Sequence, residues 1–230
     1  MNDQRMVSEP MRRVDTQVQP LDGTQSTMPA MNDQRMVSEP MRRVDTQVQP
    51  LGEVFVTVQG NTLYLRPIRS DDGPALRRGF ARLTSEQIRQ RVFHRMTELS
   101  QDDARRLANV TPMQGAAFVA TDADGEIRGD ARLYLDPGER SAEFAIIVDP
   151  SLTGQGVGRI LMHQLIVESR RRGLTELWGY VLSDNILMLD FVNYLGAQRS
   201  MVPGEPGTVR VHFDLNDPRV DADWSWDWDR

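Results

Sequence analysis

A glycine-rich stretch in the second half of the chain has the residue types and the order of a phosphate-binding loop. Residues 149–162 read DPSLTGQGVGRILM, with glycine at positions 154, 156 and 158. The apolar run SAEFAIIV precedes the stretch and a helical apolar pattern follows it, which predicts a strand, a loop and a helix. The N–H groups at a helix N-terminus lack partners within the helix, and the helix dipole favours an anion there. We therefore expect a phosphate-bearing ligand at this loop.

Three kinds of ligand are bound by such loops, and the spacing of the residues distinguishes them. A Walker loop requires a lysine, but each of the 27 basic residues of this chain is arginine. A dinucleotide loop requires G-x-G-x-x-G/A, and its third position is Arg159 when counted from Gly154 and Leu161 when counted from Gly156. The remaining ligand is coenzyme A, whose diphosphate is bound by a [Q/R]-x-x-G-x-[G/A] loop. TGQGVG supplies both glycines of this pattern, although Thr153 stands at its first position.

The elements that must position this loop follow from the apolar periodicity and the turn residues. Alternating apolar residues predict strands, and three- to four-residue spacing between caps predicts helices. We expect strands over residues 54–58, 63–67, 116–121, 126–134, 141–148, 174–182 and 208–213, and helices over residues 74–82, 85–92, 101–108, 156–172 and 185–195.

Composition excludes several classes of function. The formal net charge is −6 and the isoelectric point about 5.2, which argues against a nucleic-acid binder. There is no cysteine, and the three histidines are scattered, so we expect no disulfide and no metal. Without lysine there is no Schiff-base chemistry. No stretch has transmembrane length and no apolar leader is present, so we expect a cytoplasmic protein without a membrane partner.

The chain divides into three parts. Residues 1–21 recur unchanged as residues 31–51, and this unit is polar, contains proline and lacks aromatic residues. We therefore expect residues 1–52 not to pack a core, residues 53–214 to form one domain, and residues 215–230 to form an acidic tail. The tail carries three tryptophans, at positions 224, 226 and 228, which either bind a partner or pack back on the domain. The sequence carries no signal for an oligomeric state.

The order of the elements and the loop together resemble the GNAT superfamily of N-acetyltransferases over residues 63–213. The resemblance rests on SAEFAIIVDPSLTGQGVGRILMHQLI and on SDNILMLDFVNYLGA, in which an asparagine leads a helix that ends in Leu-Gly. More narrowly, LRPIRSDDGPALRRGFARLTSEQIRQRVFHRMTELS is similar to the start of the GNAT domain of Pat-type bacterial protein lysine acetyltransferases. The resemblance implies an α/β fold with a mixed, mostly antiparallel sheet flanked by helices, and acetyl-CoA as co-substrate.

The resemblance also implies roles for individual residues. Glu143 lies on the strand before the loop and would be the general base for an attacking amine, with Ala142, Phe144 and Ala145 desolvating it and raising its pKa. Asn185 would bind the pantetheine arm or cap the last helix. The backbone of the same strand would pair with the pantetheine, and the loop would bind the diphosphate. The residues expected to contact acetyl-CoA are Ile146, Ile147, Val148, Thr153, Gly154, Gln155, Gly156, Val157, Gly158, Arg159 and Asn185.

Several alternatives stay open. Many GNAT members place a tyrosine four residues before the helix-ending glycine to protonate the thiolate, but Val192 stands there, so we assign no general acid. Tyr194 should face in another direction. The acceptor is expected to be a protein lysine; a small-molecule amine and a non-catalytic acyl-CoA-binding module are the alternatives. The absence of lysine fits a GC-rich genome, and it would also spare a lysine acetyltransferase from modifying itself.

Overall fold

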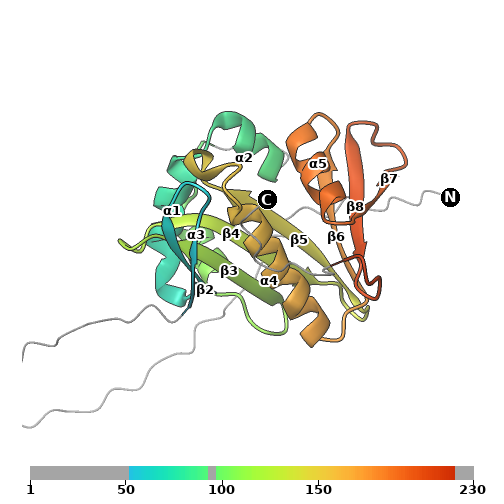
Figure 1. The fold of residues 1–230 in the computed structure, drawn as a ribbon, viewed down its shortest axis with the longest axis horizontal. Coiled ribbons are helices and arrows are strands. Elements are labelled where there is room, and N and C mark those ends of the chain that lie inside the picture. The colour runs from blue at the N-terminus through green and yellow to red at the C-terminus, as the bar shows by residue number, and fades with distance from the viewer. Residues whose placement is uncertain (1–51, 93–96, 221–230) are drawn as a thin grey trace, which may run out of the picture. The chain divides into compact units, whose positions relative to one another are not determined.

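A computed structural model describes residues 52–92 and 97–220, and within them eight strands form one sheet (Figure 1). The strand order is β1-β2-β3-β4-β5-β6-β8-β7, and neighbours are antiparallel except for β5 and β6, which are parallel. This is the mixed, mostly antiparallel sheet that the sequence predicts. The strands are β1 (Glu53–Val56), β2 (Thr62–Pro67), β3 (Gly115–Thr121), β4 (Ile127–Leu135), β5 (Ser141–Val148), β6 (Glu176–Leu182), β7 (Gln198–Met201) and β8 (Thr208–Asp214).

Helices cover both faces of the sheet, because successive strand residues point to opposite sides. On one face, α4 (Val157–Arg171) buries Leu161 and Leu165 completely in a core that includes Phe118 of β3 and α5 (Ile186–Tyr194). On the other face, α1 (Gly73–Ala81) and α3 (Gln101–Ala108) form a second core with Val119 of β3. Figure 1 shows α4 crossing the front of the sheet. A third helix of the first half, α2 (Ser85–Val92), contacts β5.

The predicted elements are found within a few residues of their expected bounds, with one omission. β7 was not predicted, because its residues QRSM are all exposed and show no apolar alternation. After β8 the chain remains packed, since Leu215 and Val220 are buried in the core of the α4 face. The duplicated segment and the three tail tryptophans lie outside the described residues. Among the helices that the structure describes, none combines the length and apolarity needed to cross a bilayer.

Candidate active site

β5 and β6 pair at one end only. Ser141–Glu143 lie opposite Glu176–Trp178, and the ladder between the two strands ends there. On its other side, β5 pairs with β4 from Ala142 through Val148. Phe144 still lies against β6, since a Cβ atom on Gly179 would be 3.0 Å from the carbonyl oxygen of Phe144. Beyond Phe144, the edge of β5 that faces β6 has no strand partner among the described residues and is open.

The alternation of an antiparallel ladder decides which backbone groups face this open edge. The N–H of Asp149 donates to the carbonyl oxygen of Arg128 at 2.8 Å, so these two residues form a hydrogen-bonded pair. Continuing the register, Ile147 directs its N–H and C=O to β4, whereas Ile146 and Val148 direct theirs away from it. The expectation of three consecutive pairing residues therefore has to be corrected: the sheet itself uses the backbone of Ile147.

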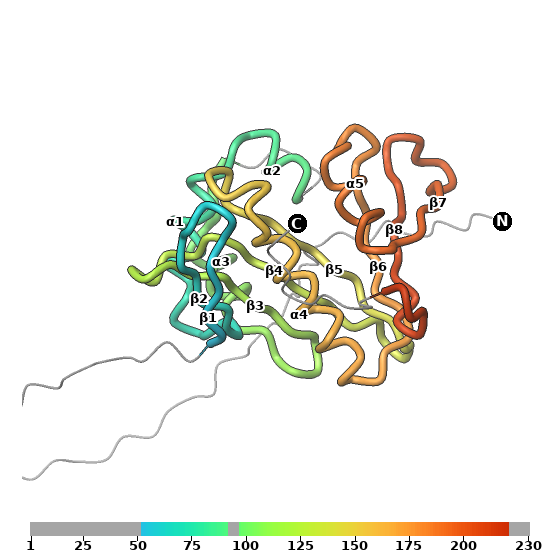
Figure 2. Tube along the Cα trace, viewed as in Figure 1, coloured from blue at the N-terminus to red at the C-terminus, as the bar shows by residue number. Residues whose placement is uncertain are grey.

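Helix α2 borders the open edge and links it to the start of α5. The side-chain amide of Gln87 donates to the carbonyl oxygen of Val148 at 3.2 Å, which agrees with the outward direction of that carbonyl. The guanidinium of Arg89 pairs with the carboxylate of Asp184 at 2.8 Å, immediately before α5. Figure 2 shows α2 and α5 side by side at the top of the view. The sequence analysis did not identify Gln87, since a glutamine on a polar helix carries no signal.

The glycine loop has the backbone that an anion site requires. After a short 3-10 turn (Pro150–Leu152), Gly154 has a φ of 77° and Gly156 a φ of 88°, a region that other residues rarely adopt. Gly156 is the N-cap of α4, so the N–H groups of the first turn have no partners within the helix. The N–H groups of Val157 and Gly158 are among them.

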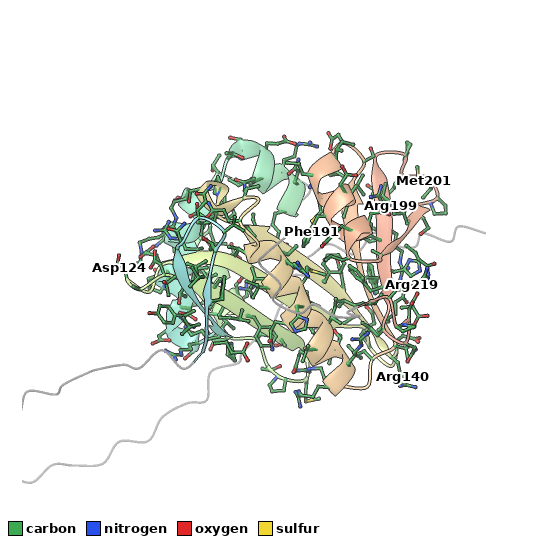
Figure 3. The ribbon with its side chains drawn as sticks, in the orientation of Figure 1. Asp124, Arg140, Phe191, Arg199, Met201 and Arg219 are labelled. Carbon is green, nitrogen blue, oxygen red and sulfur yellow. The ribbon has the colours of Figure 1, made fainter. Side chains whose placement is uncertain are left out.

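Gly158 lies where the loop meets α5. A Cβ atom at this position would lie 3.5 Å from Cζ of Phe191 and 3.8 Å from a methyl carbon of Val148. Figure 3 shows Phe191 between α4 and α5. The glycine therefore faces the space between the end of β5 and α5, next to the open strand edge.

The side chains of the loop have different roles. Thr153 is exposed. Gln155 is 3% exposed; its side-chain oxygen accepts hydrogen bonds from the hydroxyl of Thr57 at 3.0 Å and the amide of Asn61 at 3.1 Å. Its side-chain nitrogen donates to the carbonyl of Ser151 at 2.8 Å. These buried bonds make the Gln155 side chain an anchor between the loop and the β1–β2 hairpin, which differs from the expected ligand contact.

A buried carboxylate supports the start of the loop. Asp149 accepts hydrogen bonds from the N–H and hydroxyl of Ser151 at 3.0 and 2.7 Å, from Arg82 at 2.8 Å and from Arg128 at 3.2 Å. Burial by itself would raise the pKa of Asp149, but these hydrogen bonds outweigh it and hold the pKa below its ordinary value. The charged carboxylate thereby fixes the turn between β5 and the loop.

Glu143 is half-buried on β5, opposite Tyr134 of β4 and Trp178 of β6. Burial raises the pKa of Glu143 above its ordinary value; the positive charge of Arg91 opposes this effect and the negative charge of Asp136 adds to it. The expected direction of the pKa shift is confirmed, but two of the expected neighbours do not cause it.

Ala142 and Phe144 are those two neighbours, and they face the opposite side of the sheet, in the core under α4. The residues that surround the carboxyl come instead from the adjacent strands and from α2. A carboxyl that holds its proton more tightly than an ordinary glutamate is suited to accept a proton near neutral pH.

The remaining predicted positions lie on α5. The side-chain oxygen of Asn185 accepts a hydrogen bond from the N–H of Met188 at 3.2 Å, so the capping role is found. Val192 is fully buried, whereas Tyr194 is 72% exposed. The guanidinium carbon of Arg159 lies 6.0 Å from the centroid of the Tyr194 ring, which places that arginine between the loop and α5. Val192 has no proton to donate, and the structure provides no observation that assigns Tyr194 as a general acid.

In the part of the chain that the structure describes, no group of three histidine, aspartate or glutamate residues could hold a metal ion. The candidate site is therefore built from a strand edge, a glycine loop at a helix N-terminus and one carboxyl with a raised pKa.

Comparison with protein families agrees with this geometry. The family model described as Acetyltransferase (GNAT) family matches residues 80–196, about half of the chain. The chain belongs to the GNAT acetyltransferase family. The matched region of this GNAT chain runs from α1 to the end of α5 and includes the open edge of β5, Glu143, the glycine loop and Asn185.

Two relatives are informative in sequence. Acetyltransferase Pat of Mycolicibacterium smegmatis is 29% identical over 165 residues, which are 71% of this GNAT chain and 48% of Pat. The ribosomal protein bS18-alanine N-acetyltransferase of Escherichia coli is 33% identical over 79 residues, which are 34% of this chain and 49% of that enzyme. The chain spans about half the length of the curated relatives that it matches.

Solved structures share the fold. The GNAT domain of S. lividans PAT superposes with a TM-score of 0.65 at 26% identity, covering 71% of this chain and 96% of that domain. A GCN5-related N-acetyltransferase from Kribbella flavida has a TM-score of 0.55 at 25% identity, covering 66% of this chain and 97% of that structure. The almost complete coverage of both structures indicates that this GNAT chain contains one whole domain of this type.

Proposed function

We propose that this chain is an acetyl-CoA-dependent N-acetyltransferase with Glu143 as its general base. The observation that carries the proposal is the open edge of β5, which leads directly into the glycine loop and carries Glu143 on the same strand. A thioester at that edge and a base beside it are what acyl transfer to an amine requires.

The described residues fit coenzyme A. The diphosphate would lie on the first turn of α4, where Gly154 and Gly156 allow the backbone to approach an anion closely. The amides of the pantetheine arm would pair with Ile146 and Val148, the two residues whose backbone groups point away from β4. Because Gln87 already donates to the carbonyl of Val148, that side chain would share or release this acceptor when the pantetheine binds.

The chemistry then follows from the position of one carboxyl. The nitrogen of a neutral amine attacks the thioester carbonyl and forms the C–N bond, and Glu143 takes the proton that the nitrogen loses, directly or through a water molecule. The tetrahedral intermediate collapses by breaking the C–S bond, and coenzyme A leaves as a thiolate. A thiolate is a fair leaving group, so the scheme assigns no general acid.

For the acceptor, we propose a lysine side chain of a protein. Two observations support this choice, the similarity to Acetyltransferase Pat and the resemblance in structure to the GNAT domain of S. lividans PAT. A small-molecule amine is the alternative outcome of the test.

The test incubates the full chain with acetyl-CoA and a bacterial lysate and detects acetyl-lysine by mass spectrometry, with thiol release measured in parallel over a panel of small amines. Since the enzyme contains no lysine, its own side chains add no acetyl-lysine background. We expect Glu143→Gln to lower the rate about 10²- to 10⁴-fold while acetyl-CoA binding is retained. Asp102→Asn, an exposed position on α3, serves as the control. Equal rates for Glu143→Gln and the wild type would refute the role of the base, and turnover of small amines alone would refute the protein acceptor.

A further inference from the structure

A second acidic residue, Asp136, lies on the same face of the sheet as Glu143, and the proposed reaction does not use it. Asp136 follows β4, and its N–H donates to the carbonyl of Ser141 at 3.1 Å, which continues the β4–β5 register by one pair. Tyr134, two residues earlier, is the register partner of Glu143. Since side chains two residues apart share a face, Asp136 and Glu143 lie on one surface.

The carboxylate of Asp136 is bound to the indole of Trp178. The indole nitrogen donates to Oδ2 of Asp136 at 2.7 Å, and the hydroxyl of Ser141 donates to the same oxygen. Trp178 belongs to β6 and Asp136 lies on the β4 side of β5, so the ring reaches over β5. It does so at the level of Glu143, which is the register partner of Trp178.

Two further contacts hold the indole from its other sides. The guanidinium carbon of Arg210 lies 4.9 Å from the centroid of the Trp178 ring, and Arg210 is itself paired with Glu176 at 2.8 Å. The ring of Tyr180 meets the indole edge-on, with 5.2 Å between centroids and an interplanar angle of 75°. An aromatic ring with a hydrogen bond at its nitrogen, a cation on its face and a ring at its edge has little freedom to move.

We propose that Asp136 and Trp178 are a positioning pair for Glu143, in which the Asp136 carboxylate holds the indole over β5 so that the ring keeps water away from the Glu143 carboxyl. The effect on turnover rests on the proposed function, in which Glu143 is the base. The exclusion of water from the Glu143 carboxyl by the indole does not depend on whether the chain is an active enzyme.

Charged and titratable groups face Glu143 from three sides. Tyr134 comes from β4, Asp136 from the turn after β4, and Arg91 from α2. On β6, Glu176 is occupied by its pair with Arg210. Burial and the charge of Asp136 raise the pKa of Glu143, and Arg91 opposes them. Removing the charge of Asp136, or exposing the carboxyl to water, must therefore lower that pKa.

The experiment uses the full chain throughout and measures two quantities separately, the titration of the Glu143 carboxyl and the rate of the reaction. Side-chain carboxyl carbons are labelled with ¹³C and titrated by NMR, and the Glu143 signal is assigned by its loss in Glu143→Gln. The variants are Asp136→Asn, which removes only the charge, Trp178→Phe, which removes the indole N–H and shortens the ring, and Asp102→Asn, which removes an exposed charge on α3. Thermal melts of each variant establish that the fold is intact.

We expect the Glu143 titration midpoint to move to lower pH in both Asp136→Asn and Trp178→Phe, and to stay unchanged in Asp102→Asn. The acidic limb of the kcat/KM profile should move in the same direction. Above this limb kcat/KM should fall, by up to about 100-fold for Trp178→Phe, because the base is weaker and less well placed. A role of Asp136 in stability alone would change the melts and leave both pH midpoints where they are.

The possible failures are distinct. Identical Glu143 titrations in the wild type, Asp136→Asn and Trp178→Phe overturn the positioning pair. A titration that moves while the pH dependence of kcat/KM does not supports the positioning pair and refutes Glu143 as the base.

Discussion

Replacing Gly154 with alanine separates the backbone strain of the loop from its role in ligand binding, because Gly173 offers a matched control. Gly154 has a φ of 77° and Gly173 a φ of 72°, and a Cβ atom at either position would meet nothing within 4 Å. The two glycines lie beyond opposite ends of α4, a helix of 15 residues and about 22 Å in length.

The expected loss of stability is the same for both variants. The left-handed conformation costs a residue with a Cβ atom about 1–2 kcal/mol, and no steric term is added at either site. For a domain of this size each kcal/mol lowers Tm by about 2–4 °C, so both Gly154→Ala and Gly173→Ala should melt roughly 2–8 °C below the wild type.

The expected effect on ligand binding differs. The methyl group of Gly154→Ala would project from the loop proposed to hold the diphosphate, displacing it from at least one backbone N–H. A hydrogen bond to a charged group contributes about 1.5–3 kcal/mol, so Kd for acetyl-CoA should rise roughly 10- to 100-fold. Titration calorimetry measures Kd, and Gly173→Ala should bind like the wild type. If the two variants bind acetyl-CoA equally well, or lose affinity equally, the loop is not the diphosphate site.

Two further predictions concern stability. Because the pKa of Glu143 is raised in the folded state, the native chain binds that proton more tightly than the unfolded chain, and this contribution to stability is lost as pH rises through the folded pKa. Glu143→Gln should therefore have a higher Tm than the wild type at pH 8. This difference in Tm should disappear at a pH below the range in which an ordinary glutamate titrates, and a constant difference at all pH values would contradict the raised pKa of Glu143. Asp130 pairs with Arg132 at 2.7 Å where the arginine side chain is 1% exposed, so Asp130→Ala should cost about 3–5 kcal/mol in urea unfolding. Asp102→Ala breaks an exposed ion pair with Arg105 and should lower the free energy of unfolding by less than about 1 kcal/mol. Equal losses of unfolding free energy in the two variants would show that burial does not determine the cost of breaking an ion pair.

Local signals in the sequence were sufficient for much of the fold. β5 was predicted with its observed bounds because its apolar run is bounded by charged and turn residues, and α4 because its apolar stripe ends at Gly173. β7 escaped prediction because a fully exposed edge strand has no apolar alternation, and only its pairing with β8 makes it a strand. Strand pairing joins residues that are distant in sequence, so no local pattern reports it.

The candidate site shows the same division. Residue type and spacing predicted the backbone of the glycine loop, because the conformation at Gly154 and Gly156 requires residues that lack a Cβ atom. The role of Glu143 as base stays a proposal. Sequence alone could not show that Ile147 is turned to β4 or that Gln155 is bonded to Thr57, since both depend on contacts across the sheet and between distant segments.

The backbone conformation of the loop was thus determined by the sequence, through glycines at fixed spacing. Which groups surround Glu143 was decided only by the tertiary structure. The indole of Trp178, the carboxylate of Asp136 and the guanidinium of Arg91 come from three separate elements, and only the pairing of the strands and the packing of α2 bring them near one carboxyl. Electrostatic and hydration effects act through distance in space, which the order of residues along the chain does not specify.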